Sequence, residues 1–331
     1  MHSVKIYLPW RNKLPPTLFR QTLKNCGIWK NYKFSINEEK EPCDFLVVFA
    51  GQNSIIEEHI HKKNTLFIAG EPPAIKGYSE AYLAQFGSVI CSDPKLHHPQ
   101  KRLYQQGYPW FCGIRFDESG EQHITKSYDD FRQDTNIKKT KLLSVVCSDK
   151  QSKPGHNKRF QFVQKLKEAF GDELDLYGTG QNPIADKSEA IRPYKYHIAI
   201  ENSEAPHYWS EKLSDCYLEG AFPLYSGCPN LQDYFPKNAY ASIDLNDLEG
   251  TVQQIKCAIE EDRYTQSLQA IKEAKTRVLN DYNLFNLITE HFDRLNLIDN
   301  KSEKPFVAYP SKWLRKGPLY RLKFKIKQMI K

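Results

Sequence analysis

The chain has 331 residues, 40% of them hydrophobic and 13% aromatic, so it is neither a disordered nor a collagen-like protein. Its formal net charge is +7, but nine of its 47 Lys and Arg residues lie in 304–331, which contains no Asp or Glu. The other 38 basic and 40 acidic residues leave 1–303 nearly neutral. A nucleic-acid groove needs basic residues across the body of a protein, so nucleic acid is not an expected partner.

No apolar run approaches the roughly 20 residues that a membrane-spanning helix needs. Residues 1–6 read as a strand and lack the apolar core of a signal peptide. The eight cysteines are scattered without a Cys-x-x-Cys pair, which is typical of reduced, packed thiols. These features predict a cytoplasmic protein.

Short β-rich runs alternate with helical patterns along the first third of the chain. We expect strands at Val4–Leu8, Phe45–Phe49, Leu66–Ala69 and Ser88–Cys91. Between them we expect helical or loop segments, including Pro16–Asn25 and Ser54–His61. The polar stretch Asp117–Thr140 has almost no apolar periodicity, which predicts a loop or linker between domains.

The alternation then restarts. We expect strands at Lys141–Cys147, Leu174–Tyr177, His197–Ile200, Phe222–Tyr225 and Tyr240–Ile243. We expect helices at Lys158–Phe170, Ser210–Glu219, Leu248–Ile259, Tyr264–Leu279 and Asn283–Leu297. This order predicts two Rossmann-like α/β domains facing a cleft, 1–135 and 136–303, followed by a basic, apolar tail at 304–331. Ligands of such sheets bind beyond the carboxyl ends of the strands.

The most informative stretch is Tyr194–Gly227. A strand ends at Glu201-Asn202, a polar turn follows, and a helix begins near Ser210, which is a suitable N-cap residue. The N-terminus of a helix favours anions, and Lys212 in its first turn adds a full positive charge. The alternative is that Glu211 only caps the helix and Lys212 is only solvated.

The same stretch resembles the donor-binding region of family 10 glycosyltransferases, the alpha-1,3/4-fucosyltransferase family, in its bacterial form. The matching residues are Ile200-Glu201-Asn202, Ser210-Glu211-Lys212 and Pro223–Gly227, and the likeness extends over about 158–244. Two features depart from the family pattern. Ser226 replaces a Trp, and the turn Glu204–Trp209 is this chain's own.

The resemblance implies a GT-B-type fold and a GDP-sugar donor, with the acceptor bound by 1–135 and the nucleotide sugar by 136–303. It assigns Arg159 and Lys212 to the diphosphate, Glu211 to the ribose hydroxyls and Asn202 to the nucleoside end. Glu201 is also counted among the donor-binding residues. Tyr208 is placed to donate a hydroxyl hydrogen. The chain has no Asp-x-Asp, so we expect these side chains and helix N–H groups, with no required metal or other cofactor, to balance the diphosphate charge. A solvated charge at a helix start is the alternative for Arg159.

Leu66–Ala69 leads directly into Gly70-Glu71-Pro72-Pro73. Pro72 restricts Glu71 to an extended conformation, so its carboxylate is held at a strand tip. A general base needs such a fixed carboxylate, and the family also places a catalytic Glu after the equivalent strand. We therefore expect Glu71 to be the base; a loop Glu without chemistry is the alternative.

The other candidates are weaker. His97-His98 and His59-x-His61 lack a third ligand at suitable spacing, so no metal site is expected. Tyr177–Gly180 suggests a tight turn near phosphates, although it matches no phosphate-loop motif. The aromatic residues Tyr104, Tyr108, Trp110 and Phe111 either line an acceptor cleft or pack in a core.

Together these observations predict an inverting, metal-independent transferase that moves L-fucose from GDP-fucose to a hydroxyl of a surface polysaccharide or lipopolysaccharide oligosaccharide. The apolar and basic residues of 311–331 suit an anionic membrane surface, so the enzyme is expected at the inner face of the cytoplasmic membrane. A solvated tail, or one packed on the first domain, is the alternative. For the whole chain, the alternatives are another sugar nucleotide on the same fold, or a catalytically silent glycan- or membrane-binding protein.

Overall fold

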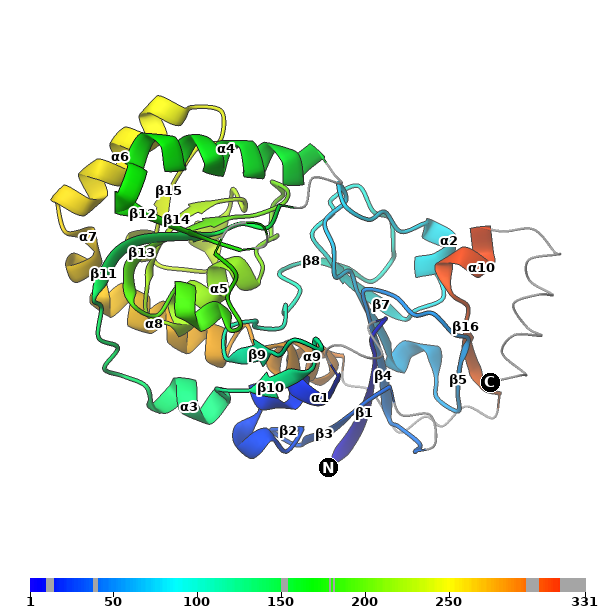
Figure 1. Ribbon diagram of the computed structural model, residues 1–331. Coiled ribbons are helices and arrows are strands. Elements are labelled where there is room, and N and C mark those ends of the chain that lie inside the picture. The colour runs from blue at the N-terminus through cyan, green and yellow to red at the C-terminus, as the bar shows by residue number, and fades with distance from the viewer. Residues whose placement is uncertain are drawn as a thin grey trace. The chain divides into compact units, whose positions relative to one another are not determined.

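The computed structural model describes residues 1–9, 15–37, 41–149, 154–178, 180, 182–295 and 304–315. The chain divides into two compact units (Figure 1). Unit 1 comprises Met1–Pro16, Gly27–Gln106 and Phe285–Lys331. Unit 2 comprises Thr17–Cys26 and Gly107–Leu284. No helix in the described part of the chain is long and apolar enough to cross a membrane.

A seven-stranded sheet with the order β2-β3-β1-β4-β6-β7-β8 forms the centre of unit 1. Only β2 and β3 pair antiparallel; the other neighbours are parallel. All five residues of β4 are buried, as expected for a parallel strand covered on both faces. The strands are β1 (His2–Tyr7), β2 (Ile28–Trp29), β3 (Tyr32–Ile36), β4 (Phe45–Phe49), β6 (Thr65–Ile68), β7 (Ser88–Cys91) and β8 (Lys101–Leu103).

Unit 2 contains a five-stranded parallel sheet with the order β12-β11-β13-β14-β15. Figure 1 shows α4 and α6 on one face of this sheet and α5 and α8 on the other. The strands are β11 (Lys141–Val146), β12 (Leu174–Tyr177), β13 (Tyr194–Ile200), β14 (Phe222–Ser226) and β15 (Ala241–Ser242). The helices are α4 (Pro154–Phe170), α5 (Glu211–Leu218), α6 (Leu248–Glu260), α7 (Arg263–Gln266) and α8 (Leu268–Leu279).

The boundary expected at 135/136 lies elsewhere. The segment Asp117–Thr140, expected to be a linker, contains β10 (Gln122–Ile124), which pairs with β9 (Ile114–Phe116), and α3 (Tyr128–Gln133). It belongs to unit 2 because Lys126 forms an ion pair with the buried Glu219, with Nζ 2.6 Å from Oε1. The periodicity of a short stretch of sequence cannot reveal a charge pair between residues that are far apart in the chain.

The chain also returns to unit 1 earlier than expected. Helix α9 (Leu284–Arg294) packs on its sheet, with the ring of Phe292 stacked 4.3 Å from that of Phe45 and the ring of Phe285 4.8 Å from that of Phe34. The helix expected at Asn283–Leu297, assigned to the second domain, is therefore mainly part of unit 1.

Residues 304–315, expected to begin a separate tail, fold onto unit 1. Strand β16 (Phe306–Ala308) pairs antiparallel with β5 (Ile56–Glu58), and α10 (Ser311–Arg315) contacts α2 (Glu80–Leu83), beside which Figure 1 draws it. The prediction of a helix or loop at Ser54–His61 is thus wrong, because its strand partner lies some 250 residues away. The rest of the tail, 316–331, lies outside the described residues.

Pro16–Asn25, expected to be helical or loop, contains most of the short helix α1 (Pro15–Leu18) and two 3-10 turns, Phe19–Gln21 and Leu23–Asn25. One helical prediction was too long. Tyr264–Leu279 is divided into α7 and α8 at Ser267.

Gly70 permits the close approach of the ends of β4 and β6. A Cβ at this position would lie 2.5 Å from the Ala50 Cβ and 2.8 Å from Phe49 Cε1, whereas a Cβ at Gly77 would meet no heavy atom within 4 Å. We expect Gly70→Ala to lower the free energy of unfolding by about 1–3 kcal/mol and Gly77→Ala to leave it nearly unchanged, as measured by urea denaturation. Equal stability of the two variants would contradict this account of the strand ends.

Candidate active site

The carboxyl end of β13 and the start of α5 are joined by a buried carboxylate. Glu201 N donates to Ser226 O at 2.9 Å, which continues the parallel ladder one residue past β13. The Glu201 carboxylate accepts from Ser210 N and from Ser210 Oγ, each at 2.7 Å, and its side chain is fully buried. Glu201 therefore fixes the residue that caps α5.

The first turn of α5 holds Glu211 and Lys212 as an ion pair. Ser210 is the N-cap, as predicted, and its side chain accepts from Lys212 N. Lys212 Nζ lies 3.1 Å from Glu211 Oε1, 3.1 Å from Ser210 Oγ and 3.4 Å from Glu201 Oε2. Both Glu211 and Lys212 keep a little under one fifth of their side-chain surface exposed.

The charges around Glu211 and Lys212 shift the pKa of both side chains. Burial disfavours the carboxylate form of Glu211, but the charges of Lys212 and Lys187 outweigh burial and lower the pKa of Glu211 to about 2. Burial likewise disfavours the charged Lys212, yet Glu211 and Glu201 raise the pKa of Lys212 above its usual value. The pair is therefore ionised at neutral pH.

Arg159 reaches the same place from α4. Its Nη1 donates to Asn202 Oδ1 at 2.6 Å and its Nη2 lies 3.4 Å from Ser148 Oγ, while its Nε has no partner among the described residues. Arg159 is only 7% exposed, and its charge opposes protonation of Lys212, so the two cations are neighbours. The sequence assigned both to one diphosphate, and the structure brings them together.

Gly155 lets α4 start directly on the end of β13. A Cβ at Gly155 would lie 2.0 Å from Asn202 O, so no larger residue fits without a backbone shift. Gly227 has the same function after β14, since its Cβ would lie 2.5 Å from Glu201 Cγ. Both glycines were missed as site residues, because their role depends on contacts between distant segments.

A third cation, Lys187, was also missed. It lies in the 3-10 turn Lys187–Ala190, and its Nζ is 2.9 Å from Oδ2 of the fully buried Asp215. Lys187 also acts electrostatically on Glu211 and Lys212. The sequence signals a capped turn at Asp186–Glu189, but nothing in it links that turn to α5.

Tyr208 is buried rather than open to solvent. It is 3% exposed, and its ring packs edge-on against Tyr108 with 5.9 Å between centroids. The turn around it is fixed, because His207 N donates to Asn230 Oδ1 at 2.8 Å and the Trp209 ring packs on Phe235. The turn that departs from the family pattern is therefore a packed part of unit 2.

Glu71 lies in unit 1, three residues past the end of β6, and is half-buried. The turn behind it is closed by Ile75 N and Lys76 N, which both donate to Pro72 O, at 2.9 and 3.0 Å. As the sequence predicted, Glu71 stands at a strand tip before a proline-stiffened turn.

Residues 136–276 match the family described as glycosyltransferase family 10 (fucosyltransferase), C-terminal part. The alpha-(1,3)-fucosyltransferase B of Drosophila melanogaster is 32% identical over 112 residues, which cover 34% of this chain and 21% of that protein. The alpha-(1,3)-fucosyltransferase FucT of Helicobacter pylori is 28% identical over 154 residues, 46% of this chain and 28% of that protein. The chain thus spans less than a third of the length of these curated relatives.

A crystal structure of an alpha1,3-fucosyltransferase with GDP-fucose superposes with a TM-score of 0.53 at 14% identity, covering 92% of this chain and 93% of that one. We refer to residues 136–276, which match this family model, as the family 10 domain. The expected α/β fold of GT-B type is also confirmed, since both sheets are mainly parallel and the likeness extends over most of the chain. The residues from Arg159 to Lys212 discussed above all lie in the family 10 domain.

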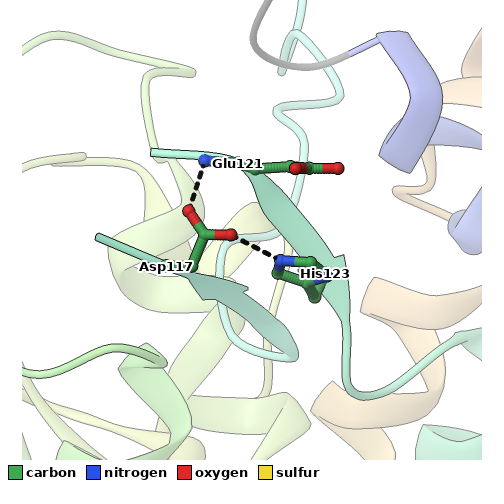
Figure 2. Close-up of side chains that lie close together, drawn as sticks. All are labelled: Asp117, Glu121 and His123. Atoms are coloured by element: carbon green, nitrogen blue, oxygen red, sulfur yellow. Dashed lines mark hydrogen bonds and ion pairs between the residues drawn. The ribbon is translucent and has the colours of Figure 1, made fainter. Parts of the chain in front are cut away.

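Outside the family 10 domain, Asp117, Glu121 and His123 gather on the β9–β10 hairpin (Figure 2). His123 Nε2 lies 2.8 Å from Asp117 Oδ2, and Glu121 N donates to Asp117 Oδ1 at 2.9 Å. Asp117 also accepts from Ser119 N, so the hairpin turn itself explains why these groups are close. The histidines considered from sequence do not belong to this cluster: His61 and His98 each accept from a backbone amide two residues ahead.

Trp110, considered as an acceptor-cleft aromatic residue, is a core residue. It is 2% exposed and packs edge-on against Phe131. Of Tyr177–Gly180, the described Gly178 adopts φ +128° and would clash with Cys147 O if it carried a Cβ, so a tight turn is present there.

The depressed pKa of Glu211 predicts a pH-dependent contribution to stability. A carboxyl whose pKa falls from 4.5 to about 2 on folding stabilises fully above pH 4.5, and the contribution is lost as pH falls towards 2. We expect Glu211→Gln to lower the free energy of unfolding at pH 7 by about 1–3 kcal/mol, with the difference from wild type vanishing between pH 4.5 and 2. Denaturation at several pH values measures this.

The matched control is Glu249→Gln, which changes an exposed Glu in the first turn of α6 and should follow the wild-type curve throughout. A Glu211→Gln curve parallel to wild type down to pH 2 would show that Lys212 and Lys187 do not hold this carboxylate.

Proposed function

We propose that this protein is an inverting glycosyltransferase that moves L-fucose from GDP-fucose to a hydroxyl of a glycan. The observation that carries the proposal is the cluster of Arg159, Asn202, Glu211 and Lys212, which lies at a strand end and a helix N-terminus within the family 10 domain. The crystal structure with the same fold holds GDP-fucose, which supports this donor.

The leaving GDP develops negative charge on the β-phosphate oxygen as its bond to the sugar breaks. Arg159 and Lys212, together with the N–H groups at the start of α5, are suited to stabilise that charge, so no metal is required in the proposal. Glu71 takes the proton of the acceptor hydroxyl while its oxygen attacks the anomeric carbon from the face opposite GDP. A single displacement inverts the configuration and needs one base.

The proposed acceptor is a surface polysaccharide or lipopolysaccharide oligosaccharide, and the proposed location is the cytoplasm, peripherally at the inner face of the membrane. The near-neutral body and the basic stretch 316–331 support this location. Another sugar nucleotide remains the second candidate, because Ser226 stands where the family pattern has a Trp at the donor site.

The test of the reaction is Glu71→Gln. Loss of the base should lower kcat for fucose transfer by about 100-fold or more, while GDP binding measured by calorimetry stays unchanged. Glu57→Gln, which changes an exposed Glu of β5 in the same unit, is the control and should retain full turnover. Transfer should continue in EDTA, and UDP and CMP should bind far more weakly than GDP.

Four results would count against the proposal. Full activity of Glu71→Gln would show that Glu71 is not the base. Loss of activity in EDTA would rule out a metal-independent mechanism. Tight binding of UDP or CMP alone would favour the second candidate, and absence of transfer from every donor would favour a silent binding protein.

Deletion of 316–331 tests the membrane proposal. Because Ser311–Arg315 form α10, the deletion should begin at residue 316, which removes six of the nine basic tail residues and keeps β16 and α10. Binding to liposomes with anionic lipid should be lost, since each basic residue contributes about 1 kcal/mol at such a surface. Undiminished binding, or equal binding of wild type to neutral liposomes, would refute the electrostatic anchor.

A further inference from the structure

A cavity of about 340 Å³ lies within unit 1 at the carboxyl ends of its central strands. Pro9 follows β1, Gly51–Asn53 follow β4, and Ile75–Tyr78 follow the turn after Glu71. A fourth wall comes from the far end of the described chain, Pro310–Lys312. This volume is at the lower end of the ~300–1,000 Å³ usual for small-molecule pockets.

The backbone after β4 turns sharply at the cavity. Ala50 has φ 58° and Gly51 φ 109°, conformations that cost a residue with a side chain free energy. A Cβ on Gly51 would come within 3.4 Å of Lys76 Nζ and 3.7 Å of the Tyr82 hydroxyl. Lys76 Nζ in turn donates to Ala50 O at 2.6 Å, so this wall is fixed by contacts on both sides.

Two buried polar atoms of the cavity wall have no protein partner among the described residues: Gln52 Nε2 and Ser311 Oγ. Gln52 is only 8% exposed, and its Oε1 accepts from the Tyr82 hydroxyl, which fixes the amide. A buried amide N–H or hydroxyl without a partner is costly, so each calls for a polar ligand or water.

The wall contributed by the C-terminal segment is firmly held. Tyr309 N donates to Gln85 Oε1 at 2.7 Å, and Gln85 Nε2 donates back to Tyr309 O at 3.1 Å. Phe306 is part of the core of unit 1, and the Trp313 ring stacks on Tyr309 with 3.9 Å between centroids. Ser311 is therefore anchored on both sides.

The cavity is a neighbour of Glu71. Tyr78 lines it, and the hydroxyl of Tyr78 has a raised pKa, mainly through burial and additionally through the negative charge of Glu71. The turn that follows Glu71 forms part of the wall, because the lining residues Ile75 and Lys76 both donate from their backbone N–H groups to Pro72 O.

We propose that this cavity binds a sugar residue of the acceptor glycan, with the Gln52 amide and the Ser311 hydroxyl hydrogen-bonding its hydroxyl groups. The returning C-terminal segment then helps to determine which acceptor is used. The inference rests on the proposed fucosyl transfer and assigns its second substrate to a set of residues. Sugar hydroxyls both donate and accept, so they match an amide N–H and a Ser hydroxyl.

Three variants test the cavity. Gly77→Leu adds bulk at a wall position where a Cβ meets no protein atom within 4 Å. Ser311→Ala removes one hydroxyl. Gln52→Glu keeps the side-chain oxygen that accepts from the Tyr82 hydroxyl and removes the amide donor. The probe is the disaccharide 4-galactosyl-N-acetylglucosamine, which the name of a related enzyme of Pongo pygmaeus gives as acceptor. Kinetics with GDP-fucose give KM for each substrate, and calorimetry gives the Kd of GDP.

We expect Ser311→Ala and Gln52→Glu to raise the KM of the disaccharide about three- to tenfold each, the effect of one lost hydrogen bond. Gly77→Leu should raise it more than tenfold. In all three the KM of GDP-fucose and the Kd of GDP should stay at wild-type values. Ser311→Thr, which keeps the hydroxyl, should restore the KM, and Thr135→Leu, at an exposed position in unit 2, should not change it.

The outcomes separate the two proposals. Wild-type transfer to the disaccharide with an unchanged KM in Gly77→Leu overturns the cavity assignment and leaves the fucosyl transfer standing. Binding of GDP without transfer from GDP-fucose to any glycan overturns the proposed function. Transfer to other glycans with no detectable binding of the disaccharide would show that the cavity does not bind this class of sugar.

Discussion

The buried carboxylate of Glu201 is the interaction on which the candidate donor site depends. It is fully enclosed and bound by Ser210 N and Ser210 Oγ, so it joins the end of β13 to the first turn of α5. Lys212 is then held between Glu201 and Glu211. Removing the Glu201 carboxylate would leave the buried Ser210 without its hydrogen-bond acceptor and Lys212 without its fixed position. The carboxylate therefore matters for the geometry of the site more than for direct contact with a ligand.

Fixing the cations in advance also has a consequence for the proposed catalysis. A free lysine or arginine loses much side-chain entropy when it orders around a phosphate. Here Lys212 is already paired and Arg159 is already bonded to Asn202, so that entropy is lost on folding rather than at each encounter with a donor. Groups held in this way stabilise a developing charge without rearranging, which is how enzymes obtain their largest electrostatic effects.

The sequence predicted those parts of the site that are encoded locally. The end of β13, the Ser210 cap and the start of α5 follow from apolar runs and capping residues, and the proline after Glu71 marks a strand tip. Several missed features are nonlocal: Lys187 meets α5 through Asp215, Gly155 faces Asn202, and β16 pairs with a strand near residue 57. Strand β3, with Tyr32 and Phe34 buried in alternation, and helix α3, with its Ser127–Asp130 capping box, were missed although their signals are local.

The return of the chain to unit 1 connects the proposed membrane-binding stretch with the proposed acceptor cavity. Helix α9 and the β16–α10 segment pack on unit 1, and residue 316 follows α10 directly, so the basic stretch is attached to the unit that contains Glu71 and the cavity beside it. An acceptor carried on a membrane lipid is concentrated at the surface that such a stretch would bind. Under the two proposals, attachment to this unit, and not to the family 10 domain, would bring the proposed acceptor cavity to that surface, while a water-soluble GDP-sugar would reach the proposed donor residues by diffusion.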